Sequence, residues 1–117
     1  MFLFPKLVGS PEHRWFLQSG IQTYGLMVDK IISNKAMLTS KWRPLEDIVG
    51  RSDVHGKTDT DDSIIISFPP RSNWQRGHGY LFYSGNRMTV DPGDTNRYFF
   101  SDTQMYYYHL TNSWYQF

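Results

Sequence analysis

The final third of the chain alternates tracts of aromatic residues with short polar turns. The tracts are Tyr80-Leu81-Phe82-Tyr83, Tyr98-Phe99-Phe100, Met105-Tyr106-Tyr107-Tyr108 and Trp114-Tyr115-Gln116-Phe117. Aromatic tracts separated in this way are typical of successive β-strands of one sheet. We therefore expect this part of the chain to form an aromatic β-meander.

One further strand and several turns complete the predicted meander. Ile64–Phe68 is a β-branched run that ends at two prolines. Ser84–Asn86 contains a glycine and predicts a hairpin that joins Tyr80–Tyr83 to Met88–Val90. Two more turns are predicted, a type II turn at residues 91–94, where proline precedes glycine, and a turn at residues 111–113.

Two short helices are predicted in the first half of the chain. A serine followed by proline and an acidic residue is typical of a helix start, so we expect a helix over Pro11–Ser19. This helix would place Trp15 and Phe16 inward and stop at Gly20. Pro44–Val49 has apolar residues at helical spacing, and Gly50 follows as the expected cap.

Residues 21–38 fit two structures. Their apolar residues match one face of a helix, but the β-branched side chains and the polar break at Ser33–Lys35 fit a hairpin. Gly25 and the closely spaced turn-forming residues of this segment favour strands.

These elements predict a mainly β fold. We expect an antiparallel sandwich or small barrel of about six to eight strands, with one or two short N-terminal helices. The alternative is an α+β fold, if residues 21–38 are helical. The 117 residues are expected to form a single domain. Within it, residues 1–9 would be an apolar N-terminal arm, residues 51–63 an exposed acidic loop and residues 64–117 the meander.

The aromatic strands do not alternate apolar with polar residues. Tyr106 and Tyr108 point to one face of their strand, and Tyr107 points to the other. Both faces therefore carry large, weakly polar side chains. Either the sheet is central to its fold, or one face contacts a partner, where tyrosine and tryptophan are favoured. We favour a partner, because a chain of this length has little else to cover 20 aromatic residues.

Composition disfavours several classes of protein. The net charge of +1 is too small for a protein that holds duplex nucleic acid chiefly through its phosphates. The absence of cysteine excludes disulfides and thiolate metal sites. No signal peptide or membrane-spanning run is expected, because Pro5 and Lys6 interrupt the apolar start of the chain. The expected location is the cytoplasm or an assembled particle.

One segment has the residue order of an RNP1-type strand, with histidine at the first aromatic position. This segment is Arg76-Gly77-His78-Gly79-Tyr80-Leu81-Phe82-Tyr83. In such strands exposed aromatic rings stack on unpaired bases. The second strand and the helix of an RNA-recognition fold are missing upstream. A binding module for single-stranded nucleic acid or a glycan is therefore the second hypothesis, and it would use Trp74, Arg76, His78, Tyr80 and Phe82.

Catalytic and metal-binding patterns are not apparent. Residues 59–62 are acidic but lack the further ligands of a calcium loop, so they predict a solvated loop. The four histidines have no paired spacing, and no serine lies in a nucleophile motif. Trp42 and Trp74 lie near basic residues, which predicts cation–π packing at the surface. We expect no enzyme activity, no metal and no cofactor.

The leading hypothesis is a non-enzymatic structural or interaction subunit of a larger protein assembly, of the kind found in phage or virus particles. Its partners would be other protein subunits, the same or different. The contacts would use the apolar arm and an aromatic sheet face that includes Tyr106, Tyr108 and Trp114. A third hypothesis is a small β-barrel that holds an apolar ligand.

Overall fold

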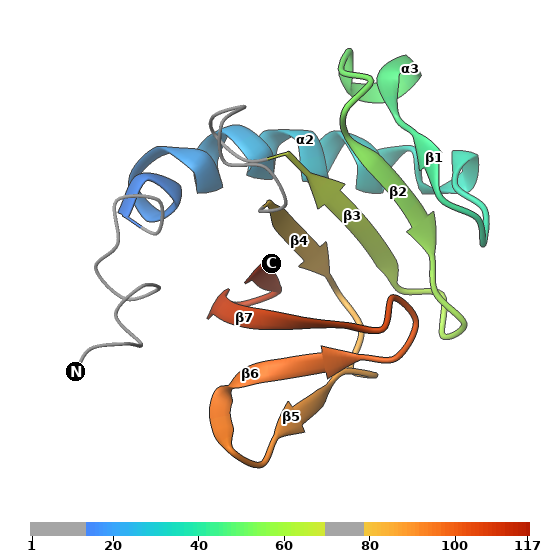
Figure 1. Cartoon of the computed structure of the whole chain (residues 1–117). Helices are drawn as coiled ribbons and strands as arrows, with labels where there is room; N and C mark the ends of the chain where they lie inside the picture. The colour runs from blue at the N-terminus through green and yellow to red at the C-terminus, as the bar shows by residue number, and fades with distance from the viewer. Residues whose placement is uncertain (1–13, 70–78) are drawn as a thin grey trace.

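The computed structural model describes residues 14–69 and 79–117, and it confirms a mainly β fold. In this part of the chain eight strands form one antiparallel sheet in the order β1-β2-β3-β4-β8-β7-β6-β5 (Figure 1). The strands are β1 Arg43–Pro44, β2 His55–Thr58, β3 Ile64–Phe68, β4 Tyr80–Tyr83, β5 Thr89–Asp91, β6 Asp94–Phe100, β7 Met105–Thr111 and β8 Trp114–Gln116. The helical segments are the π-helical turn Phe16–Gly20, α2 Ile21–Ser33, the 3-10 turn Lys35–Met37 and α3 Glu46–Val49.

The preference for strands in residues 21–38 was wrong, because α2 occupies most of this range. Tyr24, Val28 and Ile31 are buried at helical spacing, and packing of this face on the sheet outweighs the modest cost of β-branched residues in a helix. The expected stop at Gly20 was also wrong. Gly20 has a helical φ of −61°, and a Cβ there would lie 2.7 Å from the ring of Trp15. Glycine is needed here for close packing, and the helix continues through it.

Two predictions in the second half of the chain also need correction. The loop predicted at residues 51–63 contains β2, and its Asp59 is buried. The hairpin predicted around Ser84–Asn86 does not form, because β4 pairs with β3 and β8 while β5 pairs with β6. The predicted turn at residues 91–94 does join β5 to β6, but it is not type II, since Gly93 lacks a positive φ.

Three other predictions are confirmed. Phe16 is fully buried, as expected for the inward face of the first helix. Gly50 caps α3 with a left-handed φ of 78°. Asn112, with φ of 50°, lies at the turn between β7 and β8. The expected apolar arm at residues 1–9 lies outside the described residues.

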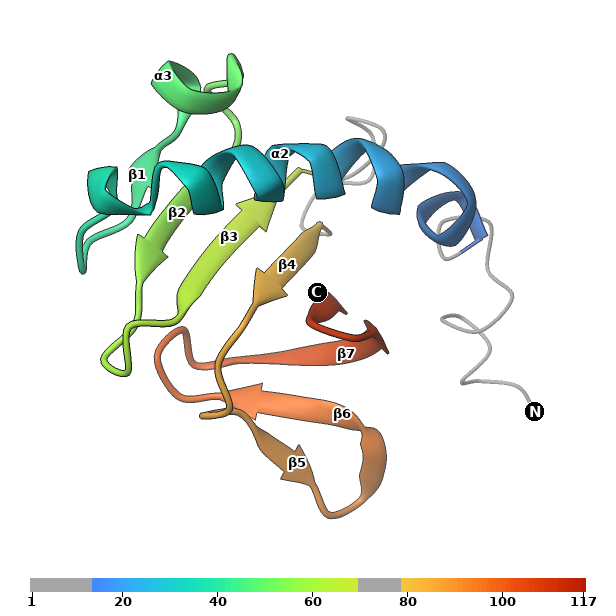
Figure 2. The ribbon, with the colours of Figure 1, turned by 180° about the vertical axis from the view of Figure 1, so that it is seen from behind.

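The helix covers one face of the first half of the sheet. Figure 2 shows α2 crossing in front of β2 and β3. Its buried side chains join one core with apolar residues of β3, β4 and β8, among them Ile66, Phe68, Tyr80 and Trp114. Aromatic stacking orders this core, because the ring of Phe16 lies 4.5 Å from that of Tyr80.

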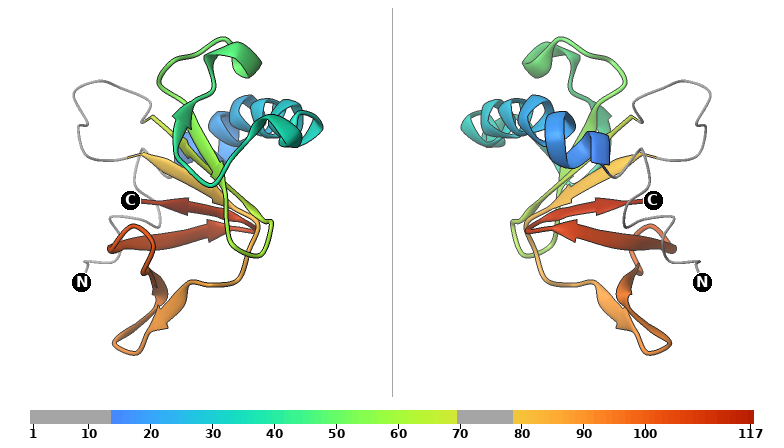
Figure 3. Two further views of the ribbon diagram at one scale, coloured as in Figure 1. Left: turned by 90° about the vertical axis from the view of Figure 1, so that its right-hand side faces the viewer. Right: turned by 90° about the vertical axis from the view of Figure 1, so that its left-hand side faces the viewer.

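The sheet covers its own opposite face by coiling. In Figures 1 and 3, β6 and β7 run across the direction of β2 and β3. A second core therefore forms between the two halves, from Ile65, Leu81 and Tyr83 on one side and Phe100 and Tyr107 on the other. The aromatic residues on both faces are thus largely used within the fold, which was the alternative that the sequence analysis did not favour.

Candidate functional site

The sequence analysis predicted eight binding residues, three for a protein partner and five for a nucleic acid or glycan. Two of these eight residues belong to the core. Tyr80 is 0% exposed and Trp114 is 5% exposed, both beneath the helical segment that begins at Phe16. Phe82 is half-buried, with its ring 5.2 Å from that of Trp114. Tyr80 consequently has no ring face open to a stacked base. The other three residues of the predicted nucleic-acid or glycan site lie outside the described residues. They are Trp74, Arg76 and His78.

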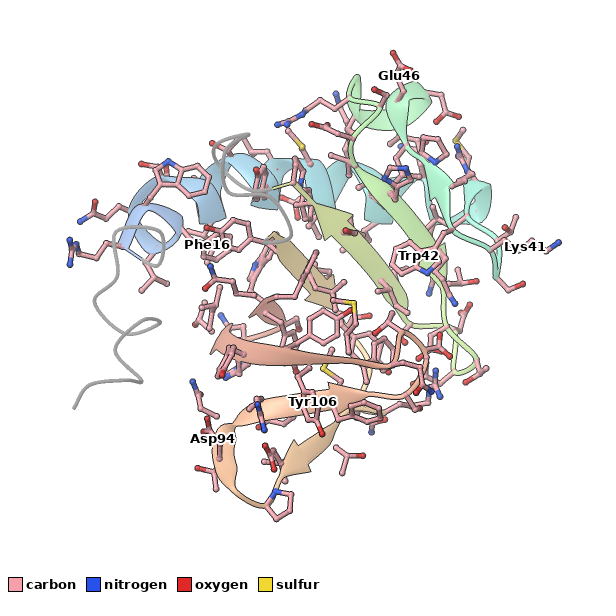
Figure 4. All side chains as sticks on the ribbon, viewed as in Figure 1. Phe16, Lys41, Trp42, Glu46, Asp94 and Tyr106 are labelled. Atoms are coloured by element: carbon pink, nitrogen blue, oxygen red, sulfur yellow. The ribbon has the colours of Figure 1, made fainter. Side chains whose placement is uncertain are left out.

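Tyr106 and Tyr108 lie together on a part of the sheet that no helix of residues 14–69 or 79–117 covers. Arg97 pairs with Tyr108 and Phe99 pairs with Tyr106 in the register of β6 and β7, so all four side chains project from one face. We name these four residues the Tyr106 surface. Tyr106 is 50% exposed, and the other three side chains are half-buried. Figure 4 shows Tyr106 on the β6–β7 half of the sheet, well away from α2.

The geometry of the Tyr106 surface is fixed by its own contacts. The guanidinium carbon of Arg97 lies 4.4 Å from the ring centroid of Tyr106, and the rings of Phe99 and Tyr106 lie 5.1 Å apart. The Nε of Arg97 also donates to Asp91 at 2.8 Å. The backbone N–H of Gly93, together with Arg97, lowers the pKa of Asp91. The cation therefore stays in place over the tyrosine ring.

The edges of the sheet are poorly suited to further strand pairing. The outermost strands in the sheet order, β1 and β5, have two and three residues. The register of β5 also shifts between Val90 and Asp91. Short and irregular edge strands limit pairing with another chain. The described edges of the sheet therefore offer little backbone for a further strand.

A pocket of about 310 Å³ opens on the sheet face turned away from α2. It is lined by Trp42, His55, Ser67, Leu81, Thr103, Met105, Tyr107 and Phe117. The pocket lies where the coiled half of the sheet, carrying Met105 and Tyr107, approaches strands β2 to β4. Figure 4 shows Trp42 in front of β2 and β3. The pocket is thus a concave site shared by both halves of the sheet.

An ionic network lies beside this pocket and ties three loops to the sheet. The Asp59 carboxylate, 1% exposed, accepts two bonds from Arg87 and a third, at 2.8 Å, from the hydroxyl of Tyr83. Arg87 also pairs with Asp102 at 3.3 Å, and Asp102 pairs with Lys57 at 3.0 Å. These bonds hold the β6–β7 loop, which carries the pocket residue Thr103, against β2.

The charges in this network are fixed. Arg87, together with the backbone N–H of Thr60 and the hydroxyl of Tyr83, lowers the pKa of Asp59 to about 2. Lys57, and after it Arg87, lower the pKa of Asp102. The pKa of Arg87 is raised in turn by Asp59. Groups held this firmly in one charge state stabilise the fold and exchange no protons near neutral pH.

No group of three or more potential metal ligands occurs in the described ranges. Within the same ranges, no helix is both long and apolar enough to span a bilayer. Comparisons of the chain with protein-family models, curated proteins and solved structures found no match. Any functional assignment therefore depends on the residues of this chain alone.

Sequence reasoning missed the residues that line the pocket. His55 and Ser67 meet because β2 and β3 pair at that position, and β2 was predicted to be a loop. Asp59 and Arg87 are 28 residues apart, and no local pattern links them. Trp42 did carry a signal, since cation–π packing was expected there. The cation is Lys57, whose Nζ lies 5.7 Å from the ring, and not a sequence neighbour.

Proposed function

We propose that this chain is a non-enzymatic interaction subunit that associates with a second copy of itself through the Tyr106 surface. The observation that carries the proposal is the half-exposed ring of Tyr106 on a sheet face that no described helix covers, with Arg97 at 4.4 Å. Tyrosine and arginine are enriched among the residues that dominate binding energy at protein interfaces. Both side chains are already ordered, which reduces the entropy lost on association.

The composition of the Tyr106 surface favours a second copy as the partner. A two-fold contact brings the same patch of both subunits together, so the patch must complement itself. This surface holds both a cation and aromatic rings, and Arg97 of one copy can lie against Tyr106 or Tyr108 of the other. The exposed polar residues Asp94–Asn96, at the start of β6, would supply the rim.

The ionisable groups support a role without catalysis. Acid–base catalysis needs a group whose pKa lies near neutral pH. Among the described residues, each aspartate with a resolved shift has a lowered pKa, and hydrogen bonds to neighbouring groups cause most of these shifts. These aspartates are Asp47, Asp53, Asp59, Asp61, Asp91 and Asp102. Such carboxylates hold structure and are poor proton donors.

Light scattering coupled to size exclusion tests the proposal. We expect the purified protein to elute as a dimer and to dissociate on dilution. Tyr106→Ala removes the central ring of the contact and should shift the protein to monomer, while leaving its circular dichroism spectrum unchanged.

Leu26→Ala is the matched control, because Leu26 is 72% exposed on α2, remote from the Tyr106 surface. The substitution removes an exposed apolar side chain and should leave the dimer intact. A wild-type protein that remains monomeric at every concentration would contradict self-association. A dimer that persists in Tyr106→Ala would place the contact elsewhere.

A further inference from the structure

The pocket beside Trp42 has apolar walls of mostly aromatic character. Trp42, Tyr107 and Phe117 contribute rings, and Leu81 and Met105 contribute aliphatic and thioether surface. Burial raises the pKa of the Tyr107 phenol, as expected for a wall poor in water. Rings and a methionine sulfur favour contact with a flat aromatic molecule. The volume of about 310 Å³ lies near the lower end of the range for small-molecule sites.

Two polar side chains on the floor of the pocket form no hydrogen bond with the described residues. Thr103 and Tyr107 share a hydrogen bond of 2.9 Å, and the Thr103 hydroxyl also lies 3.4 Å from the carbonyl oxygen of Phe100, so both hydroxyls have partners within the protein. His55 and Ser67 face the same side at paired positions of β2 and β3. No residue in the ranges 14–69 and 79–117 forms a hydrogen bond with the side chain of either residue. They can therefore bond to a guest.

The charge of the lining restricts which guest fits. None of the eight lining residues is an aspartate, glutamate, lysine or arginine. The nearby Lys57 and Arg87 are already paired with Asp102 and Asp59. An ionised guest would lose its hydration without gaining a free counter-charge, which is unfavourable. An uncharged guest with one hydroxyl or carbonyl group has no such cost.

We propose that this pocket binds a small, uncharged aromatic molecule whose single hydroxyl or carbonyl group hydrogen-bonds with His55 and Ser67. The ring system lies between Trp42 and Phe117, and its polar group lies on the β2–β3 floor. The ionic network of Asp59, Arg87 and Asp102 keeps the β6–β7 loop in place, so the pocket is formed before the guest arrives. This site is separate from the Tyr106 surface, which projects from the opposite face of the sheet.

Binding of naphthol, naphthalene and naphthoate to the full chain tests the proposal. The three probes share one ring system and differ in the polar group. Calorimetry or NMR titration should give the highest affinity for naphthol, with shifts at the Trp42 indole and the Met105 methyl group. Ser67→Val removes one hydroxyl and should weaken naphthol binding by about three- to tenfold, the size of one lost hydrogen bond. Binding of naphthalene should not change.

Thr89→Val is the control, since it also replaces a hydroxyl with a methyl group, but on exposed β5, outside the pocket. It should leave all three affinities unchanged, and valine suits both strand positions, so both variants are expected to fold. Absence of shifts at Trp42 and Met105 with every probe would overturn the proposal. Equal affinity for naphthol and naphthalene, or tighter binding of naphthoate, would also overturn it.

Discussion

Asp59 accepts two hydrogen bonds from Arg87, at 2.8 Å from Nε and 2.6 Å from Nη2, and the pair joins loops 28 residues apart in the sequence. A forked arginine–carboxylate contact of this kind is among the stronger polar interactions in proteins. Because the Asp59 side chain is only 1% exposed, its charge depends on this partner. The pair therefore fixes the β2–β3 turn to the segment that follows β4.

Asp59→Asn should destabilise the fold by about 2–3 kcal/mol, because it leaves Arg87 without its main partner while burying an amide in place of the carboxylate. Urea unfolding followed by tryptophan fluorescence measures this loss. Asp62→Asn is the matched control, since the Asp62 side chain is 84% exposed and its ion pair within the described residues is with Lys35. An exposed pair contributes little, so that variant should change stability by about 0.5 kcal/mol or less. Equal losses in the two variants would contradict a structural role for Asp59.

The same carboxylate makes stability depend on pH. Its pKa is about 2 in the folded chain and 3.8 without the fold, so the folded state favours the ionised form. The resulting stabilisation, about 2 kcal/mol, is complete above the unfolded pKa and is lost as pH falls through the folded pKa. The stability difference between wild type and Asp59→Asn should consequently shrink between about pH 5 and about pH 2. Urea unfolding at several pH values measures it, and a difference that stays constant with pH would contradict this assignment.

The strands of the meander could be predicted because their signals are local. Ile64–Phe68 and Met105–Thr111 carry long β-branched or aromatic runs, and Gly50 and Asn112 mark turns that need a positive φ. Such patterns depend on a few adjacent residues. The mainly β class followed from them directly.

Pairing between distant strands could not be predicted, and the candidate sites depend on it. β4 lies next to β8, although β5 follows it along the chain, and the coil of the sheet then brings Tyr107 over Leu81. The sequence does indicate that Tyr106 and Tyr107 face opposite sides. It does not indicate that Tyr107 enters a core while Tyr106 remains exposed, because that difference is set by packing.

Phe16→Ala should destabilise the protein by about 3–4 kcal/mol. Phe16 is fully buried, with its ring 4.5 Å from that of Tyr80 and 5.1 Å from that of Trp114, so its loss opens a cavity between the helix and the sheet. Leu17→Ala is the control, because Leu17 is 46% exposed and should lose about 0.5 kcal/mol or less. Chemical unfolding measures both. If the two variants lose similar stability, the helix does not dock on the sheet through Phe16.

Two glycines of the same helical segment should respond to alanine in opposite directions. Alanine is favoured over glycine in a helix by about 1 kcal/mol, and Gly25 has no atom within 4 Å of an added Cβ. Gly25→Ala should therefore stabilise the protein by nearly that amount. At Gly20 the added Cβ would lie 2.7 Å from the Trp15 ring and 3.0 Å from Phe16. Overpacking of a core costs about 1–3 kcal/mol, so Gly20→Ala should destabilise the protein despite its better helix propensity. Thermal unfolding of both variants shows whether each substitution raises or lowers stability. Stabilisation by Gly20→Ala would contradict the close packing of Trp15 on the helix.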